Sequence, residues 1–317
     1  MKKRYLGIDC GGTKCAVCLG DGEGNIIDKI IFPTHEPLGP QQTIDNFIKY
    51  SDELLLKHAC ELTGIGIACG SPLDPGLGII QAPAQLSSWK DVPIVKIFQD
   101  RYRVPAFLDN DANAGASAEY CFGAGRGCKH MLFLTFGTGL GAGLILDGRV
   151  YRGANCYAGE IGHFRLAPNG PVGCRKTGSF EGFCSGAGIK QLIEIELKSF
   201  KGQTCLKTGD SAADCAKAAE QGDAFALRIF EISGHYLGMG LSIVLDIINP
   251  ERVIIGSIFT RCEKFLRPAM EKTLCEEALS QTLKTCQILP SALGDSIGDL
   301  AALSVAYNEM KAAIYAV

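Results

Sequence analysis

Residues 131–151 read MLFLTFGTGLGAGLILDGRVY and carry the clearest sign of the architecture. The apolar run at 131–136 predicts a strand, a short glycine-rich turn follows, and 142–146 predicts a returning strand. Asp147-Gly148 favours a type I′ hairpin turn into a third short strand at 149–151. This stretch therefore predicts three consecutive antiparallel strands.

The same pattern occurs near the start of the chain. Residues 5–32 read YLGIDCGGTKCAVCLGDGEGNIIDKIIF. They predict strands at 5–10, 15–19 and 26–32, with a glycine turn between the first two and a second turn at 21–25. A pattern repeated at an interval of about 130 residues suggests two related α/β halves that face each other.

Apolar periodicity predicts the other elements. Further strands are expected at 64–69, 106–109, 252–255 and 287–289. Helices are expected at 42–62, 186–200, 211–221, 223–248, 262–279 and 298–313.

Composition narrows the class of protein. The chain has 317 residues, 47% of them hydrophobic and 21% charged, which suits two folded domains and excludes wholesale disorder. The net charge is −3 and no basic block occurs, so we expect no nucleic-acid partner. The first apolar run ends at Asp9, too early for a signal peptide, and no run approaches the ~20 residues that span a bilayer. We expect a soluble, cytoplasmic protein without a membrane partner.

Cysteine and glycine are both unusually frequent, with 15 and 39 residues. The cysteines are scattered singly, except that Cys15 and Cys18 form a CxxC within a predicted strand, where they would point to opposite faces. We therefore expect reduced, buried thiols in a cytosol. The glycines gather around the two repeated turns and between Gly115 and Gly188, as a ligand cleft would require.

The two glycine turns suit phosphate groups, because glycine lets backbone N–H groups approach an anion closely. The first turn adds Thr13 and Lys14, and the second adds Thr138. Plain hairpin turns are the structural alternative. The second turn also contains a GxGxxA pattern, but a dinucleotide site needs a helix next and here a strand follows. No GxxxxGK[ST] phosphate loop occurs.

Two segments carry candidate acid–base groups. Asn110-Asp111 follows a predicted strand and opens a helix, so one of the two side chains either caps that helix or Asp111 accepts a substrate proton. The residues alone leave these alternatives open. Glu160, His163 and Glu181 are polar groups that would suit a polyol.

Five segments in this order resemble the motifs of the ROK family (repressors, uncharacterised open reading frames and sugar kinases), over nearly the whole chain. They are Gly7–Lys14, Asn110–Asn113, Phe136–Gly143, Ala158–His163 and Asn249–Gly256. The resemblance implies an α/β, two-domain actin-like (ribonuclease H-like) ATPase fold, with a duplicated β-hairpin/helix core and an interdomain cleft. The smaller domain would comprise 1–113 and 298–317, and the larger 114–297.

The resemblance also implies an activity: ATP-dependent phosphorylation of a hexose or N-acetylhexosamine at its 6-hydroxyl, with Asp111 as general base and Mg²⁺ organised by Asp9. Sugar-binding residues would be Asn110, Glu160, His163, Glu181 and Gly70. Nucleotide-binding residues would be Asp9, Gly11, Gly12, Thr13, Lys14, Gly137, Thr138, Gly139, Gly256 and Ser257. The partners would be the sugar and ATP, and the assembly a homodimer.

The chain departs from the family at the zinc site. Kinases of the family often bind zinc through the His of the GEIGH motif and three Cys of a CxCGxxGC run. Here Val172 and Ser179 stand at two of those cysteine positions, which leaves His163 and Cys174. Since a structural zinc site needs four ligands, we expect no zinc. Gln85 stands where the family commonly has Asn, which leaves the identity of the sugar open.

Two other classes of protein on this fold are alternatives. A non-catalytic sugar or nucleotide sensor remains the alternative function, although Asp111 is retained. A sugar-responsive repressor would need an N-terminal DNA-binding domain, and here the first predicted strand begins at residue 5.

Overall fold

A computed structural model describes residues 3–315 of the chain, apart from the side chains of 295 and 312–315. The chain forms two compact α/β units. The first comprises Met1–Gly127, Arg149–Cys156 and Asp295–Val317. The second comprises Cys128–Gly148 and Tyr157–Gly294.

The first unit is built on a five-stranded sheet of order β3-β2-β1-β4-β7. Its strands are β1 (Arg4–Cys10), β2 (Lys14–Asp21), β3 (Ile26–Pro33), β4 (Gly64–Cys69) and β7 (Ala106–Asn110). The first three are antiparallel, and β4 and β7 run parallel to β1. Opposite each other on β1 and β2, Cys10 and Cys15 form the last pair before the glycine turn.

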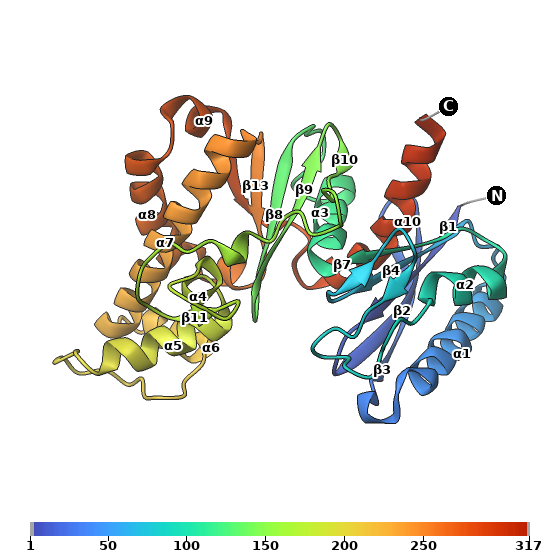
Figure 1. Ribbon diagram of the computed structural model, residues 1–317, viewed down its shortest axis with the longest axis horizontal. Helices are drawn as coiled ribbons and strands as arrows, with labels where there is room; N and C mark the ends of the chain where they lie inside the picture. Colours follow the sequence, from blue (N-terminus) through green and yellow to red (C-terminus); the bar gives the residue numbers. More distant parts are fainter. Residues whose placement is uncertain (1–2, 316–317) are drawn as a thin grey trace. The chain divides into compact units, whose positions relative to one another are not determined.

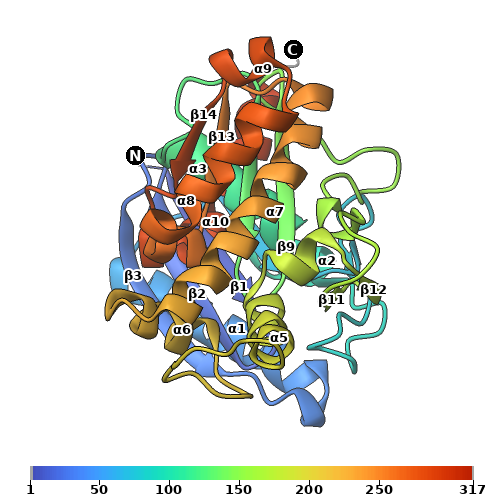
Figure 2. The same cartoon turned by 90° about the vertical axis from the view of Figure 1, so that its left-hand side faces the viewer.

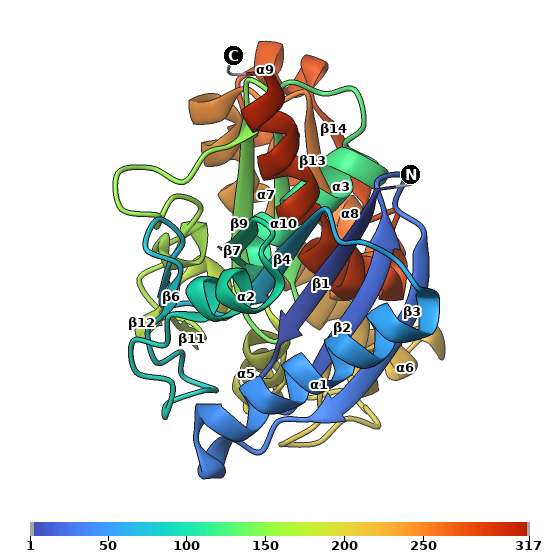
Figure 3. The same ribbon diagram turned by 90° about the vertical axis from the view of Figure 1, so that its right-hand side faces the viewer.

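Helices cover both faces of this sheet (Figures 1 and 3). One apolar core contains side chains of α1 (Pro40–His58) and α2 (Ile94–Tyr102). The other face carries α10 (Ile297–Tyr315), which packs beside α3 (Asp111–Phe122). The approach of α10 requires glycine in the sheet, since a Cβ on Gly66 would lie 1.9 Å from the carbonyl oxygen of Ala302. This close packing brings the start of α10 against β1.

A second five-stranded sheet repeats this topology and has the order β10-β9-β8-β13-β14. The strands are β8 (Met131–Phe136), β9 (Leu140–Leu146), β10 (Arg149–Val150), β13 (Arg252–Ile255) and β14 (Gln287–Pro290). An antiparallel hairpin again lies beside two parallel strands. The predicted α/β duplication is therefore confirmed.

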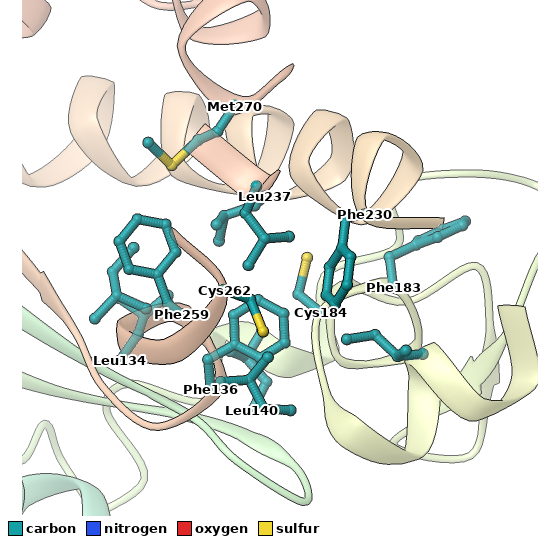
Figure 4. Close-up of a cluster of buried hydrophobic side chains, with 14 of the residues drawn as sticks. Leu134, Phe136, Leu140, Phe183, Cys184, Phe230, Leu237, Phe259, Cys262 and Met270 are labelled. Atoms are coloured by element: carbon teal, nitrogen blue, oxygen red, sulfur yellow. The ribbon is translucent and has the colours of Figure 1, made fainter. Parts of the chain in front are cut away.

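Four longer helices and one shorter helix build most of the rest of the second unit. They are α5 (Gly186–Leu197), α6 (Ala212–Glu220), α7 (Ala224–Ile248), α8 (Ile258–Glu277) and the shorter α9 (Ser280–Thr285). Helices α7 and α8 lie side by side (Figure 2). Their Phe230, Leu237 and Met270 meet Leu134 and Phe136 of β8 in one apolar core (Figure 4).

Polar caps explain where these helices begin. The Ser211 hydroxyl and the Asp214 carboxylate form a capping box at α6. At α7, the Asp223 carboxylate accepts hydrogen bonds from the backbone N–H groups of Phe225 and Ala226. The predicted helix at 262–279 starts earlier, at Ile258, because Ser257 ends the turn after β13.

Several short elements were not predicted, and all lie in loops whose sequence shows no apolar periodicity. They are β5 (Leu73–Asp74), β6 (Ile79–Ile80), β11 (Val172–Gly173), β12 (Lys176–Thr177) and α4 (Phe180–Phe183). Helices α2 and α9 were also missed. All 15 cysteines are free, and Cys205 and Cys275 are exposed rather than buried as expected. Within residues 3–315, no helix is both long and apolar enough to cross a bilayer.

Candidate active site

The first glycine turn, Gly11–Thr13, joins β1 to β2 in the first unit. Thr34 holds it from behind: its hydroxyl donates to the Gly11 carbonyl (2.6 Å) and its N–H donates to the Thr13 carbonyl (3.0 Å). The Thr13 and Lys14 side chains are exposed. The turn is therefore fixed by its backbone while its polar side chains face solvent.

Gln85 packs against this turn and also against Gly70. A Cβ on Gly12 would lie 2.4 Å from the Gln85 Cβ, and a Cβ on Gly70 would lie 2.0 Å from the Gln85 amide nitrogen. The close approach of Gln85 therefore requires glycine at both positions. The structure brings Gly12, Gly70 and Gln85 together, although they are far apart in the sequence.

Asp9 is half-buried at the end of β1, with its carboxyl near the start of α10. Burial raises the pKa of Asp9 to about 7, and the negative charges of Asp111 and Asp299 add to the rise. The Lys29 ammonium, 2.7 Å from both carboxylate oxygens of Asp299, opposes it. Asp9 is therefore an acidic group that titrates near neutrality.

Asn110 and Asp111 occupy the junction between β7 and α3. The Asn110 side chain is the N-cap of α3 and accepts a hydrogen bond from the backbone N–H of Asn113 (2.9 Å). The capping role, left open by the sequence, thus falls to Asn110. Asp111 is the first helical residue, and no protein group within residues 3–315 hydrogen-bonds its carboxyl.

The Asp111 carboxyl is accessible to water at the surface. The protein around it nevertheless desolvates the carboxyl and raises its pKa to about 6. A carboxyl with a raised pKa and no structural bond is suited to accept a proton near neutral pH.

The second glycine turn, Gly137–Gly139, joins β8 to β9 in the second unit. The N-terminus of α5 packs on it, as the N–H groups of Gly186 and Ala187 donate to the Gly137 and Thr138 carbonyls (2.8 and 3.2 Å). The Thr138 side chain is exposed. Like the first turn, it is fixed through its backbone.

A cavity of about 590 Å³ opens beside this second turn. Gly137, Thr138 and Ser257, which the sequence predicted, line it. Helices α5, α6 and α8 supply further lining groups that sequence reasoning missed, chiefly Lys190, Ser211 and Arg261. Lys190 and Arg261 are cations, so the cavity combines a glycine turn with positive charge, as a phosphate-bearing ligand needs. Gly256 is buried just before Ser257.

Ser257 has an unusual backbone, with φ 60° and ψ −111°. A Cβ on Gly137 would lie 3.6 Å from the Ser257 hydroxyl, so this side chain faces the second turn. The hydroxyl makes no capping bond to α8. A non-glycine residue held in this conformation is typical of ligand-binding positions.

The second unit also holds three predicted sugar-binding residues. Glu160 and His163 are exposed, with 3.8 Å between a carboxylate oxygen and the imidazole Nε2. Glu181 is tied down: one oxygen accepts from the Leu140 N–H (3.0 Å), and the other from the Cys174 N–H (2.9 Å) and thiol (3.3 Å). Glu181 therefore links the second hairpin to the loop around Cys174, a structural role that the sequence did not reveal.

Metal-binding groups are sparse. Within residues 3–315, no cluster of three or more His, Cys, Asp or Glu side chains is arranged to hold a metal ion. Magnesium bound with a nucleotide needs only one or two carboxylates, because phosphates and water supply its other ligands. Asp9, next to Asp111 and Asp299 in its electrostatic environment, meets that requirement.

The family assignment follows from comparison with known proteins. The model of the ROK family matches residues 5–309. The chain belongs to the ROK family. It shares 30% identity over 304 residues with a glucokinase of Halalkalibacterium halodurans, covering 93% of this chain and 92% of that protein. The α/β architecture is accordingly that of an actin-like ATPase.

Other relatives in the ROK family are regulators. The xylose repressor of Bacillus subtilis is 28% identical over 305 residues, covering 95% of this chain and 76% of the repressor.

A solved ROK glucokinase from Streptomyces griseus, in complex with glucose and AMPPNP, superposes with a TM-score of 0.76 at 25% identity, covering 96% of this chain and 99% of that one. The family thus contains both kinases and repressors.

Proposed function

We propose that this ROK protein transfers the γ-phosphoryl group of ATP to the 6-hydroxyl of a hexose or N-acetylhexosamine. The observation that carries the proposal is the Asp111 carboxyl, which starts a capped helix, has a pKa of about 6 and is hydrogen-bonded to no described protein group. The similarity to glucokinases supports the choice of a sugar as acceptor.

Asp111 is proposed as the general base. Its carboxylate takes the proton of the attacking hydroxyl as the bond to phosphorus forms, an effect of roughly 10²- to 10⁴-fold on rate. Asn110, Gly70, Glu160, His163 and Glu181 are proposed to bind the other sugar hydroxyls. Because the oxygens of Glu181 already accept protein hydrogen bonds, its contribution depends on their remaining lone pairs.

The nucleotide is proposed to be held by the two glycine turns and the cavity beside the second. Gly11, Gly12, Thr13, Lys14, Gly137, Thr138 and Gly139 would contact phosphates, and Gly256 and Ser257 would border the adenosine. Lys190 and Arg261 add positive charge to that cavity. In phosphoryl transfer, positioning and charge neutralisation supply most of the rate enhancement.

Asp9 is proposed to hold Mg²⁺, directly or through water, and the ion would neutralise charge on the transferred phosphoryl group. The ionised form of Asp9 is needed for this. Since burial and two neighbouring carboxylates raise its pKa to about 7, cation binding and deprotonation of Asp9 would be linked. Zinc is not part of the proposal.

The test is an ADP-release assay with Mg²⁺-ATP and a panel of glucose, N-acetylglucosamine, N-acetylmannosamine, mannose, fructose and allose. We expect turnover with at least one sugar, and a loss of 10²-fold or more in kcat for Asp111→Asn. Calorimetry with the same variant should still detect sugar and ATP binding. Near-wild-type turnover by D111N would overturn the assignment of the base.

A sugar or nucleotide sensor is the alternative class. It would bind sugar and ATP in calorimetry yet release no ADP with any member of the panel.

We further propose a cytoplasmic homodimer that binds no nucleic acid. The net charge of −3 argues for the last point. Light scattering on a sizing column measures the assembly, and a dimer mass is expected.

A further inference from the structure

Asp109, immediately before the proposed active-site pair, is a fully buried carboxylate with only 1% of its surface exposed. One oxygen accepts from the Asn110 N–H and the Asn113 side-chain amide, both at 2.9 Å. Both donors belong to the turn that contains Asp111. The position of this turn therefore depends on where the Asp109 carboxylate is held.

The other oxygen of Asp109 is held by Arg152. The guanidinium donates to it twice, from Nη2 at 2.6 Å and from Nε at 3.0 Å. Nη2 also donates to the Glu309 carboxylate of α10 at 2.5 Å. One guanidinium thus ties the β7–α3 junction to α10, and all these residues belong to the first unit. A lysine could not reproduce this forked geometry.

Among the residues that the structure describes, no side chain other than Arg152 donates a hydrogen bond to that oxygen of Asp109. A cavity of about 500 Å³ lies along the outer side of β7, lined by Phe107, Leu108, Arg152 and Glu309 among others. Because β7 is the edge strand, no neighbouring strand restrains it on that side. Arg152 therefore supplies the hydrogen bonds that hold Asp109 at this edge of the sheet.

We propose that Arg152 is a positioning residue for phosphoryl transfer: by anchoring Asp109, it fixes the first turn of α3 and with it the carboxyl of Asp111. The inference rests on the proposed function. A general base displaced by about 1 Å loses on the order of 10²-fold in rate, so the effect falls on kcat. Binding of ATP depends on other residues and is unaffected.

The experiment compares Arg152→Gln with Glu309→Gln. Both remove the ion pair between Arg152 and α10, but only R152Q releases Asp109. Steady-state kinetics should show kcat reduced roughly 10- to 100-fold in R152Q with the KM for ATP changed less than about 2-fold, whereas E309Q stays within about 2-fold of wild type in both. Arg152→Lys should recover only part of kcat.

Hydrogen exchange supplies a readout that needs no turnover. The amides of residues 110–116 should exchange faster in R152Q than in wild type and E309Q. Because a buried carboxylate without its partner can prevent folding, the charge-neutral double variant D109N/R152Q is measured as well. It keeps an oxygen acceptor for Asn110 but has no anchor, so its kcat should remain low.

Wild-type kcat in R152Q or in D109N/R152Q would overturn the inference, and so would unchanged exchange at 110–116. Failure of the proposed function looks different: the wild-type protein itself would phosphorylate no sugar, while the exchange comparison would still report whether Arg152 fixes this turn.

Discussion

The carboxyl of Asp111 helps to raise the pKa of Asp9 to about 7, second only to the effect of burial. The two groups come from the ends of different strands of one sheet, β1 and β7, and both would carry negative charge at the active site. Their coupling raises the pKa of Asp9 and so contributes to how the protein responds to pH.

Removal of the Asp111 charge should stabilise the ligand-free protein at high pH. In the folded protein, Asp9 and Asp111 have pKa values of about 7 and about 6, above the ~3.9 of an Asp in an unfolded chain. Their protonated forms therefore favour the folded state. This contribution to the stability of the fold is complete below pH ~4 and is lost as the pH rises through the two folded-state values. Asp111→Asn should therefore melt above wild type near pH 8 and equal it near pH 4. Differential scanning calorimetry from pH 4 to 8.5 measures this.

Asp100→Asn is the matched control for that prediction. A hydrogen bond from Lys96 lowers the pKa of the exposed Asp100 carboxyl, so this variant should not melt higher than wild type at pH 8. A D111N protein no more stable than wild type at pH 8 would contradict the raised pKa of Asp111.

Lys29→Met should shift the activity profile to higher pH. Lys29 is bound to Asp299 and opposes the rise in the pKa of Asp9, so its loss raises that pKa further. We expect lower kcat/KM near pH 6.5 and recovery near pH 8.5. Lys57→Met, which removes one of the two partners of Asp28 on the same strand β3, should leave the profile in place. A uniform loss at every pH would instead indicate a structural defect.

Glu181→Gln should destabilise the second unit by about 1–3 kcal/mol, the cost of unsatisfied polar groups. Its carboxylate accepts from the N–H groups of Leu140 and Cys174, and an amide nitrogen cannot accept from either. Urea unfolding measures the difference. Glu160→Gln alters an exposed carboxylate whose neighbour, His163, is 3.8 Å away, and should change stability by less than about 0.5 kcal/mol. Equal stability of the two variants would remove the structural role of Glu181.

Arg261→Gln should raise the KM for ATP without changing the KM for the sugar. Arg261 lines the cavity beside the second glycine turn, and its loss removes one cation from the proposed phosphate-binding surface. Initial-rate kinetics with each substrate varied in turn provide the test. Arg228→Gln, an exposed arginine paired with Glu196, is the control and should leave both constants unchanged. A selective rise in the KM for sugar would place Arg261 elsewhere in the reaction.

The sequence predicted those elements whose formation depends on residues close together in the chain. Alternating apolar residues and glycine turns predicted both hairpins, and 3.6-residue periodicity predicted α5, α7 and α10 to within a few residues. The family motifs then named the residues of the turns and of the β7–α3 junction. Each of these signals lies within one continuous segment, which is why one sequence suffices to find it.

The rest depends on contacts between distant segments. Arg152 meets Asp109 across 43 residues and Glu309 across 157, and no periodic pattern marks such a pair. Lys190 and Arg261 reach one cavity from separate helices. Glu181 looked like a free sugar ligand, because its bonds to backbone N–H groups leave no trace in residue type. Tertiary packing creates these relationships.

The position of α10 in the chain has a consequence for synthesis. The sheet of the first unit is complete at Asn110, but the helix that covers Gly66 and supplies Asp299 and Glu309 begins at Ile297. A ribosome must therefore finish the entire second unit before the first can close. The N-terminal segment of the first unit is therefore synthesised first, but the unit completes its folding last. A chain that ends before α10 leaves one face of that sheet uncovered.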